Sequence, residues 1–156
     1  MTNPVNFAFA VNFNNSFNVT GPSIGLLSEG IDANPVWLAG AEATSNGLIH
    51  ADQPLDITAK WSVDGALAGI IGGDYTVTAY FENVAVPAST VVLPGTTPHI
   101  QTTASQPYSV VINCPANGLT PGLYRLVISI TMKATSGLPL PVAGFGEIGL
   151  IQVFAA

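Results

Sequence analysis

The sequence predicts an all-β fold, an antiparallel β-sandwich, and three observations lead to it. Residues 124–133 alternate between apolar and polar side chains, which is typical of a strand with one buried face. Sixteen glycines and 12 prolines are dispersed along the chain, as turns between many short strands require. No segment shows the 3.6-residue periodicity of an amphipathic helix. The 156 residues are enough for one domain with a substantial core.

The strand at 124–133 is the strongest single signal in the chain. Its predicted inward side chains are those of Tyr124, Leu126, Ile128, Ile130 and Met132. Its predicted outward side chains are those of Arg125, Val127, Ser129, Thr131 and Lys133, of which only the valine is apolar. A tight turn at Pro121-Gly122 precedes the strand, because proline presets φ and glycine permits a positive φ. We expect Trp61, Tyr124, Leu126 and Ile128 to be buried together.

The pattern Leu119-x-Pro121-Gly122-x-Tyr124-x-Leu126-x-Ile128 resembles the penultimate strand of immunoglobulin-like, fibronectin-III-like and related early-set β-sandwiches. The resemblance covers about the last hundred residues. It implies an immunoglobulin-like sandwich with a tyrosine corner, in which the Tyr124 hydroxyl bonds to backbone within residues 117–120. It implies no activity, because such sandwiches host many functions.

The N-terminal segment alternates over residues 5–20, and Gly21-Pro22 is predicted to break the run. We therefore divide the chain into an extended strand or arm, residues 1–21, and a sandwich domain, residues 22–156. The apolar face of the arm consists of Phe7, Phe9, Val11, Phe13 and Phe17. This face must be buried, since three of its phenylalanines alone are worth about 1.5–3 kcal/mol each. The segment is either the first strand of its own sandwich or an assembly arm that pairs with a neighbouring subunit.

The remaining elements follow from alternation and turn residues. Inner strands are predicted at 56–63, which carries Trp61, and at 74–82, 108–114 and 145–154. In the last of these, Ile148, Leu150 and Phe154 alternate against Ile151 and Val153. Short apolar pieces are expected at 23–28 and 36–39, and short edge pieces bounded by proline at 91–93 and 99–103. Residues 66–73 and 137–141 are predicted to be loops.

Composition excludes several classes of partner. Only 8% of the residues are charged, and the formal net charge is -6 with three basic residues. Phosphate contacts need clustered lysine and arginine, so we expect no nucleic-acid partner. No apolar run approaches the ~20 residues of a membrane helix, so we expect no membrane insertion. No signal peptide is visible, and we expect synthesis in the cytoplasm unless a signal has been removed.

No motif indicates a reaction. Cys114 is the only cysteine, and Asn113 and Pro115 beside it supply neither the base nor the positive charge that a nucleophile needs. His50 and Asp52 with His99 would be the nearest approach to a metal site, but a loop histidine is the simpler interpretation. The aspartates do not converge on one loop, as a calcium site requires. We expect no enzyme, no cofactor and no metal.

Two function classes remain. Scarce charge and high hydrophobicity favour a structural protein that assembles with copies of itself, a homo-oligomer acting through protein–protein contacts. The alternative is a ligand-binding module for a carbohydrate, whose candidate contact residues are Tyr80, Trp37 and His99. The partner would then be a glycan or another protein.

Overall fold

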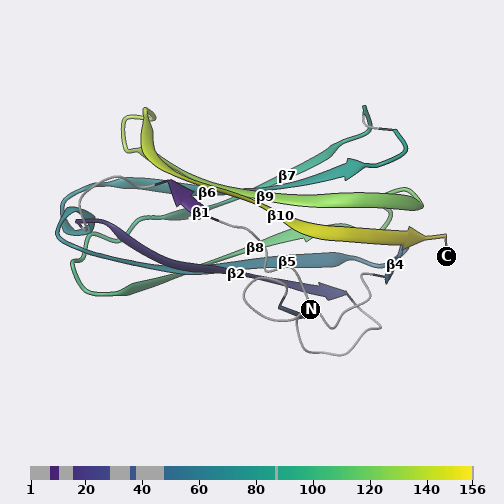
Figure 1. The fold of residues 1–156 in the computed structure, drawn as a ribbon, viewed down its shortest axis with the longest axis horizontal. Helices are drawn as coiled ribbons and strands as arrows, with labels where there is room; N and C mark the ends of the chain where they lie inside the picture. The colour runs from purple at the N-terminus through teal and green to yellow at the C-terminus, as the bar shows by residue number, and fades with distance from the viewer. Residues whose placement is uncertain (1–7, 11–15, 29–35, 38–47, 87, 156) are drawn as a thin grey trace.

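The structure is a computed structural model that describes residues 8–10, 16–28, 36–37, 48–86 and 88–155. This part of the chain is all-β and forms two stacked sheets, which confirms the predicted β-sandwich (Figure 1). Sheet A contains β1 (Ala8–Ala10), β4 (Leu48–His50), β6 (Gly73–Asn83), β7 (Val91–Pro98), β9 (Gly122–Ala134) and β10 (Pro139–Phe154). Sheet B contains β2 (Asn18–Ser28), β3 (Val36–Trp37), β5 (Leu55–Asp64) and β8 (Gln106–Cys114). A short 3-10 helix, η1 (Leu67–Gly69), follows β5.

The strand order is β1-β10-β9-β6-β7 in sheet A, where β4 also pairs with β10, and β3-β2-β5-β8 in sheet B. The paired strands are antiparallel except β4 and β10, which are parallel. The core lies between the sheets, because alternate side chains of β5, β6, β8 and β9 point inward and are buried. The strands β5, β6 and β9 therefore confirm the predicted inner strands almost to their ends.

The predicted core group is confirmed. Leu126 and Ile128 are fully buried, and Trp61 and Tyr124 belong to the same hydrophobic cluster. Val127 departs from the prediction, because it is only 5% exposed although its side chain belongs to the outer face. Its cross-strand neighbours are Tyr80 and Glu147, and long side chains of this kind shield a valine on a sheet surface.

The tyrosine-corner hydrogen bond is also confirmed. The Tyr124 hydroxyl donates to the Thr120 carbonyl at 2.8 Å and lies 2.9 Å from Thr120 Oγ1. The chain bends at Pro121, and Gly122 begins β9, so the tyrosine ring reaches the core while its hydroxyl reaches back to Thr120. This contact ties the loop before β9 to the first inward residue of the strand.

Removing that hydroxyl should weaken the fold slightly. We expect Tyr124→Phe to lower the free energy of unfolding by about 1 kcal/mol, the usual net value of a hydrogen bond. Chemical denaturation followed by tryptophan fluorescence measures the change. Tyr80→Phe is the matched control, because the Tyr80 hydroxyl has no hydrogen bond in the described part of the chain. Equal midpoints for both variants would show that the Tyr124 bond adds no stability.

The N-terminal segment contributes to both sheets. Residues 8–10 form β1, which pairs with β10 of the same chain, and the buried Phe17 precedes β2 in sheet B. The predicted break at Gly21-Pro22 is wrong, because β2 runs through both residues. The break is instead a bulge, a register shift against β5 between Thr20 and Ser23 that bends the strand without ending it. Pairing of this segment with a neighbouring subunit stays a prediction.

The predicted edge pieces are partly wrong. A single strand, β7, continues through Pro94 as far as Pro98, while residues 99–103 form no strand. Proline is tolerated there because β7 is the last strand of sheet A, where an absent N–H removes no ladder bond. The next residue, His99, is held in the core by hydrogen bonds of its ring, which take the chain away from the sheet edge.

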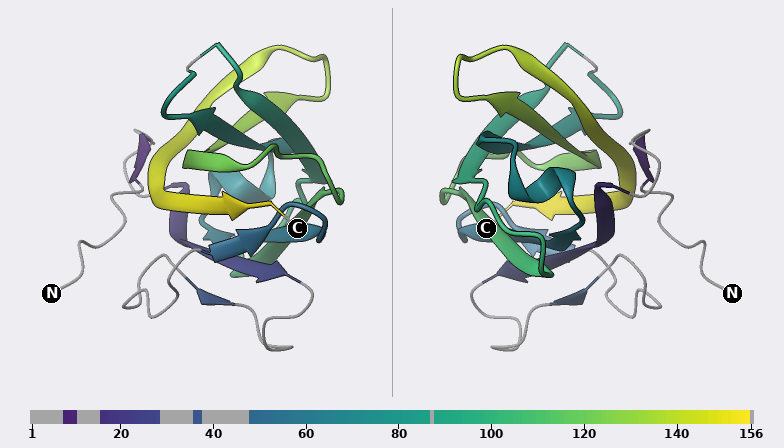
Figure 2. Two further views of the ribbon diagram at one scale, coloured as in Figure 1. Left: turned by 90° about the vertical axis from the view of Figure 1, so that its right-hand side faces the viewer. Right: turned by 90° about the vertical axis from the view of Figure 1, so that its left-hand side faces the viewer.

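The last strand also differs from its prediction. The segment predicted as a loop, residues 137–141, supplies the first residues of β10, because prolines are accepted where a strand begins. A bulge between Glu147 and Gly149 then shifts the alternation, and Gly149 takes a φ of +151°. Ile148, Ile151 and Val153 are consequently buried, whereas Leu150 and Phe154 are exposed. Figure 2 shows β10, in yellow, curving around one side of the sandwich, as a bulged strand does.

Candidate functional site

The outer face of sheet A is the most distinctive surface of the molecule. Its side chains form cross-strand rows, one residue from each of β7, β6, β9 and β10. Two adjacent rows, here called the central rows, carry no charge. They consist of Pro94, Thr78, Ser129 and Phe145, and of Thr96, Thr76, Thr131 and Ala143. Opposite residues in such rows lie about 4.5–5.5 Å apart, so the central rows make one continuous patch.

Charged side chains lie on both sides of the central rows. On one side Arg125 bridges Glu147 (Nε to Oε1, 3.2 Å) and Glu82 (Nη1 to Oε2, 3.7 Å), which joins three strands. On the other side Asp74 and Lys133 are cross-strand neighbours. All three side chains of the arginine network are about half exposed, so each pair is worth at most about 1 kcal/mol. Their main effect is to mark the limits of the uncharged patch.

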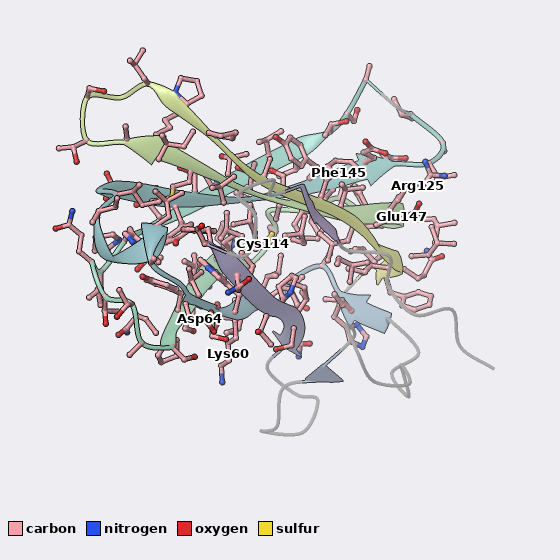
Figure 3. The ribbon with its side chains drawn as sticks, turned by 60° about the vertical axis from the view of Figure 1, so that its left-hand side comes forward. Lys60, Asp64, Cys114, Arg125, Phe145 and Glu147 are labelled. Atoms are coloured by element: carbon pink, nitrogen blue, oxygen red, sulfur yellow. The ribbon has the colours of Figure 1, made fainter. Side chains whose placement is uncertain are left out.

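Apolar side chains are exposed on this face. Phe145 is 63% exposed in a central row, and Val92 is 50% exposed in the row that also contains Tyr80. Leu150, 55% exposed, extends the apolar surface along β10 beyond Glu147. Figure 3 shows Phe145, Arg125 and Glu147 on this side of the sandwich, with Lys60 and Asp64 on the other. A face that combines threonines with an exposed phenylalanine and no central charge is suited to contact with another protein surface.

A second group of polar side chains is buried in the core around His99. A carbonyl oxygen only accepts, so His99 Nε2–H donates to the Ala68 carbonyl at 2.7 Å. The hydroxyls of Tyr75 and Tyr108 lie 2.8 and 3.1 Å from His99 Nδ1. The Tyr108 hydroxyl also accepts the N–H of Ile100 at 3.0 Å. These bonds fasten η1 and the segment after β7 to the facing strands β6 and β8.

Burial affects the protonation of Tyr75 in this cluster. The pKa of Tyr75 is raised well above its usual range, chiefly because burial disfavours the phenolate and secondarily because Tyr108 lies beside it. Trp61 packs edge-on against Tyr75 and stacks on Tyr108, with ring centroids 5.4 and 5.7 Å apart. The cluster is fully enclosed, so it supports the fold and offers no open position to a substrate.

The structure separates the residues that the sequence nominated for ligand contact. Trp37 lies in β3, opposite Gly25 of β2. Tyr80 lies half-buried on the outer face of sheet A. His99 is buried, and both of its ring nitrogens contact protein atoms. They belong to β3 of sheet B, to β6 of sheet A and to the segment that follows β7.

The residues of the predicted assembly arm are only partly described. Phe7, Val11 and Phe13 lie outside the described residues. Phe9 is the middle residue of β1, opposite Gly144 of β10. Phe17 is buried in the core, where its ring lies 6.3 Å from that of His99. Phe17 therefore belongs to the core of its own chain.

Groups that could carry chemistry are few in the described residues. Burial raises the pKa of the Cys114 thiol, which favours its protonated form. No three histidine, cysteine, aspartate or glutamate side chains come together to hold a metal ion in the described ranges. None of the helices there has the length and apolar character needed to cross a membrane.

Comparison with known proteins gives no match, either to a family model or to a curated protein sequence.

The sequence alone predicts only part of the outer face of sheet A. The outward residues of β6 and β9 follow from the alternation, and their threonines and serines are visible in the sequence. Phe145 was not nominated, because its strand was predicted to begin at that residue. Phe145 lies in one row with Ser129 and Thr78 because of the strand order and register. The residue pattern within one strand does not specify either of these.

Proposed function

We propose that this protein is a non-enzymatic structural β-sandwich that assembles with copies of itself through the outer face of sheet A. One observation carries the proposal. The central rows combine exposed Phe145 with threonine, serine, alanine and proline across four adjacent strands, and they contain no charged side chain. A contact there removes apolar area from water without desolvating a charge.

The net charge favours a second copy as the occupant of this face. Each chain carries a formal charge of -6, so two copies repel each other wherever acidic surfaces meet. A two-fold axis through the central rows places uncharged patch on uncharged patch, which is the self-complementary contact that a symmetric dimer needs. The glutamates around Arg125 then lie at the rim, where water screens them.

We also infer that the sandwich is of the immunoglobulin-like type. The inference is supported by the path β2-β5-β8 in one sheet and β7-β6-β9-β10 in the other. In chain order the first, second and fifth of these long strands share one sheet, and the third, fourth, sixth and seventh share the other. The bond from the Tyr124 hydroxyl to the Thr120 carbonyl at the start of the penultimate strand supports it further. Such folds carry many functions, so this inference adds no activity.

The alternative, a carbohydrate-binding module acting through Trp37, Tyr80 and His99, has less support. Those residues lie on separate elements, and the His99 ring is enclosed in the core. Aromatic recognition of a sugar ring needs an exposed ring beside polar groups. Tyr80 is partly exposed in the row next to the central rows, where contact with a second copy would cover it.

A charge introduced into one of the central rows should abolish assembly. We expect the protein to sediment as an oligomer at high concentration and Phe145→Lys to sediment as a monomer. Val111→Lys is the matched control, because Val111 is equally exposed (59%) but lies on the outer face of sheet B. It should keep the oligomer. Analytical ultracentrifugation over a wide concentration range measures this. A parent protein that stays monomeric, or an oligomer that survives Phe145→Lys, would contradict the proposal.

A further inference from the structure

The charged side chains of β6 and β9 on the outer face of sheet A follow a fixed order. The acidic residues Asp74 and Glu82 lie on β6, and the basic residues Arg125 and Lys133 lie on the adjacent strand β9. The register pairs Asp74 with Lys133 and Glu82 with Arg125. Within one chain such opposite-charge pairs stabilise the sheet modestly. The same order also determines which charges meet when two copies of this face come together.

The two charged pairs lie at equal distances from the middle of the face. Thr78 and Ser129 form the middle pair. Along β6 the two acidic residues each lie four positions from Thr78, and along β9 the two basic residues each lie four positions from Ser129. Since a strand rises about 3.3 Å per residue, each charged pair lies about 13 Å from the middle. The same acid-to-base order across the two strands is therefore repeated at both ends of an uncharged centre.

A two-fold axis parallel to the strands, midway between β6 and β9, stacks this face on itself with opposite charges in contact. It lays β6 of one copy over β9 of the other, so each residue faces the copy of its own cross-strand neighbour. Asp74 then faces the partner subunit's Lys133, and Glu82 faces the partner subunit's Arg125. Every contact between these charged residues joins an acid to a base.

A two-fold axis perpendicular to the strands, through the middle pair, gives the opposite result. It lays each strand over the same strand of the partner and reverses its direction. Asp74 then faces the partner's Glu82, and Lys133 faces the partner's Arg125, so like charges meet throughout. An axis parallel to the strands but centred on β9 places Arg125 over the partner's Arg125. Like charges opposed at an interface work strongly against association, so the charges favour the axis between β6 and β9.

The outer strands also fit this axis. It lays β7 of one copy over β10 of the other, so Pro94 faces the partner's Phe145. A proline against a phenylalanine is an apolar contact of the kind found in interface cores. Val92 faces the partner's Glu147 at the margin of the face, and this carboxylate is already more than half exposed to water. The strands of the two sheets are aligned, as in packed sheets, whose mean directions differ by up to about 30°.

We propose that the four charged side chains of β6 and β9 set the orientation in which two copies stack, with the two-fold axis parallel to the strands and between β6 and β9. This rests on the proposed function, because it concerns the same face. The uncharged central rows supply contact area, and the charged pairs supply the direction. Arg125 keeps its contact with Glu147 in this orientation, because a guanidinium has five N–H donors.

Two charge reversals test the orientation. Asp74→Lys makes its cross-strand pair wholly basic, and Lys133→Asp makes the same pair wholly acidic. Each variant then faces like charge in a second copy of itself, so each should self-associate at least about tenfold more weakly than the parent. An equimolar mixture should recover the parent affinity as a mixed dimer, because lysine then faces aspartate at each of these contacts. Sedimentation gives the affinities, and native mass spectrometry separates the mixed dimer from the homodimers by mass.

Lys60→Asp is the matched control, because it changes the net charge as Lys133→Asp does but lies on the outer face of sheet B. It should leave the affinity unchanged. With the perpendicular axis both test reversals would strengthen association, because each would face opposite charge, Glu82 or Arg125 of the partner subunit. That result, unchanged affinities or a mixture that stays dissociated would overturn the orientation while leaving assembly through this face intact. An oligomer that survives Phe145→Lys, or a monomeric parent, would instead remove the proposed function and the orientation together.

Discussion

Leu126→Ala is expected to lower the free energy of unfolding by roughly 2–5 kcal/mol, the range for large-to-small changes at buried sites. Leu126 is fully buried in β9, which pairs with β6 on one side and β10 on the other. The backbone there cannot close around a void, because both neighbouring strands hold it in register. The lost burial and the unfilled cavity therefore add. Urea denaturation followed by tryptophan fluorescence measures the loss.

Leu150→Ala is the matched control for this change. It deletes the same atoms on the adjacent strand, in the row that also contains Arg125, but from a side chain that is 55% exposed. We expect a loss below about 0.5 kcal/mol, as for most surface substitutions. Similar losses for the two variants would mean that Leu126 does not occupy the core, which would contradict the register of the central strand.

The second large effect is a loss of stability in alkali that depends on Tyr75. The pKa of this phenol is raised in the folded state, so the folded protein holds the proton more tightly than the unfolded chain, whose tyrosine pKa is about 10. The contribution is fully present below pH ~10 and is lost as the pH rises above that value. Each further pH unit should lower the free energy of unfolding by about 1.4 kcal/mol for this one group. Denaturation midpoints measured from pH 8 to pH 12 record the slope.

Tyr75→Phe separates the effect of Tyr75 ionisation from the other effects of alkali on stability. The variant keeps the ring that packs against Trp61 but has no proton to lose, so its stability should fall less steeply above pH 10. It should also be less stable at pH 8, because the hydroxyl no longer bonds to His99 Nδ1. Parallel pH profiles for the parent and the variant would show that alkaline unfolding begins elsewhere.

Strands whose apolar and polar residues alternate along their whole length can be predicted from the sequence. β5, β6 and β9 alternate without interruption, so their buried faces and the core around Trp61 and Leu126 could be stated in advance. β2 and β10 could not, because each contains a bulge that shifts the alternation by one position. A bulge is a property of two paired strands, and Gly149 by itself is consistent with a turn as well. Leu150 and Phe154 were therefore grouped with Ile148, although they lie on the opposite face.

The candidate surface shows the same limit. The serines and threonines of the central rows, except Thr96, follow from the alternation as outward residues. What brings Thr78 to Phe145, or Asp74 to Lys133, is pairing between strands distant in the chain. Residue patterns within one strand carry no information about that pairing, because many registers preserve the same buried face. The burial of Val127 by its neighbours has the same origin.

The prolines of β7 restrict how copies of this protein can aggregate. Along this edge strand the backbone groups of residues 92, 94, 96 and 98 point the same way, since backbone direction alternates with a period of two. Pro94 and Pro98 are two of these residues, and neither has an N–H to offer an incoming strand. Growth of a fibril by strand addition requires an uninterrupted row of donors, so this edge is a poor template for it. Only 8% of the residues are charged, so charged side chains cover little of the surface, and the prolines protect this edge instead. The assembly proposed above uses a sheet face and leaves this edge unpaired.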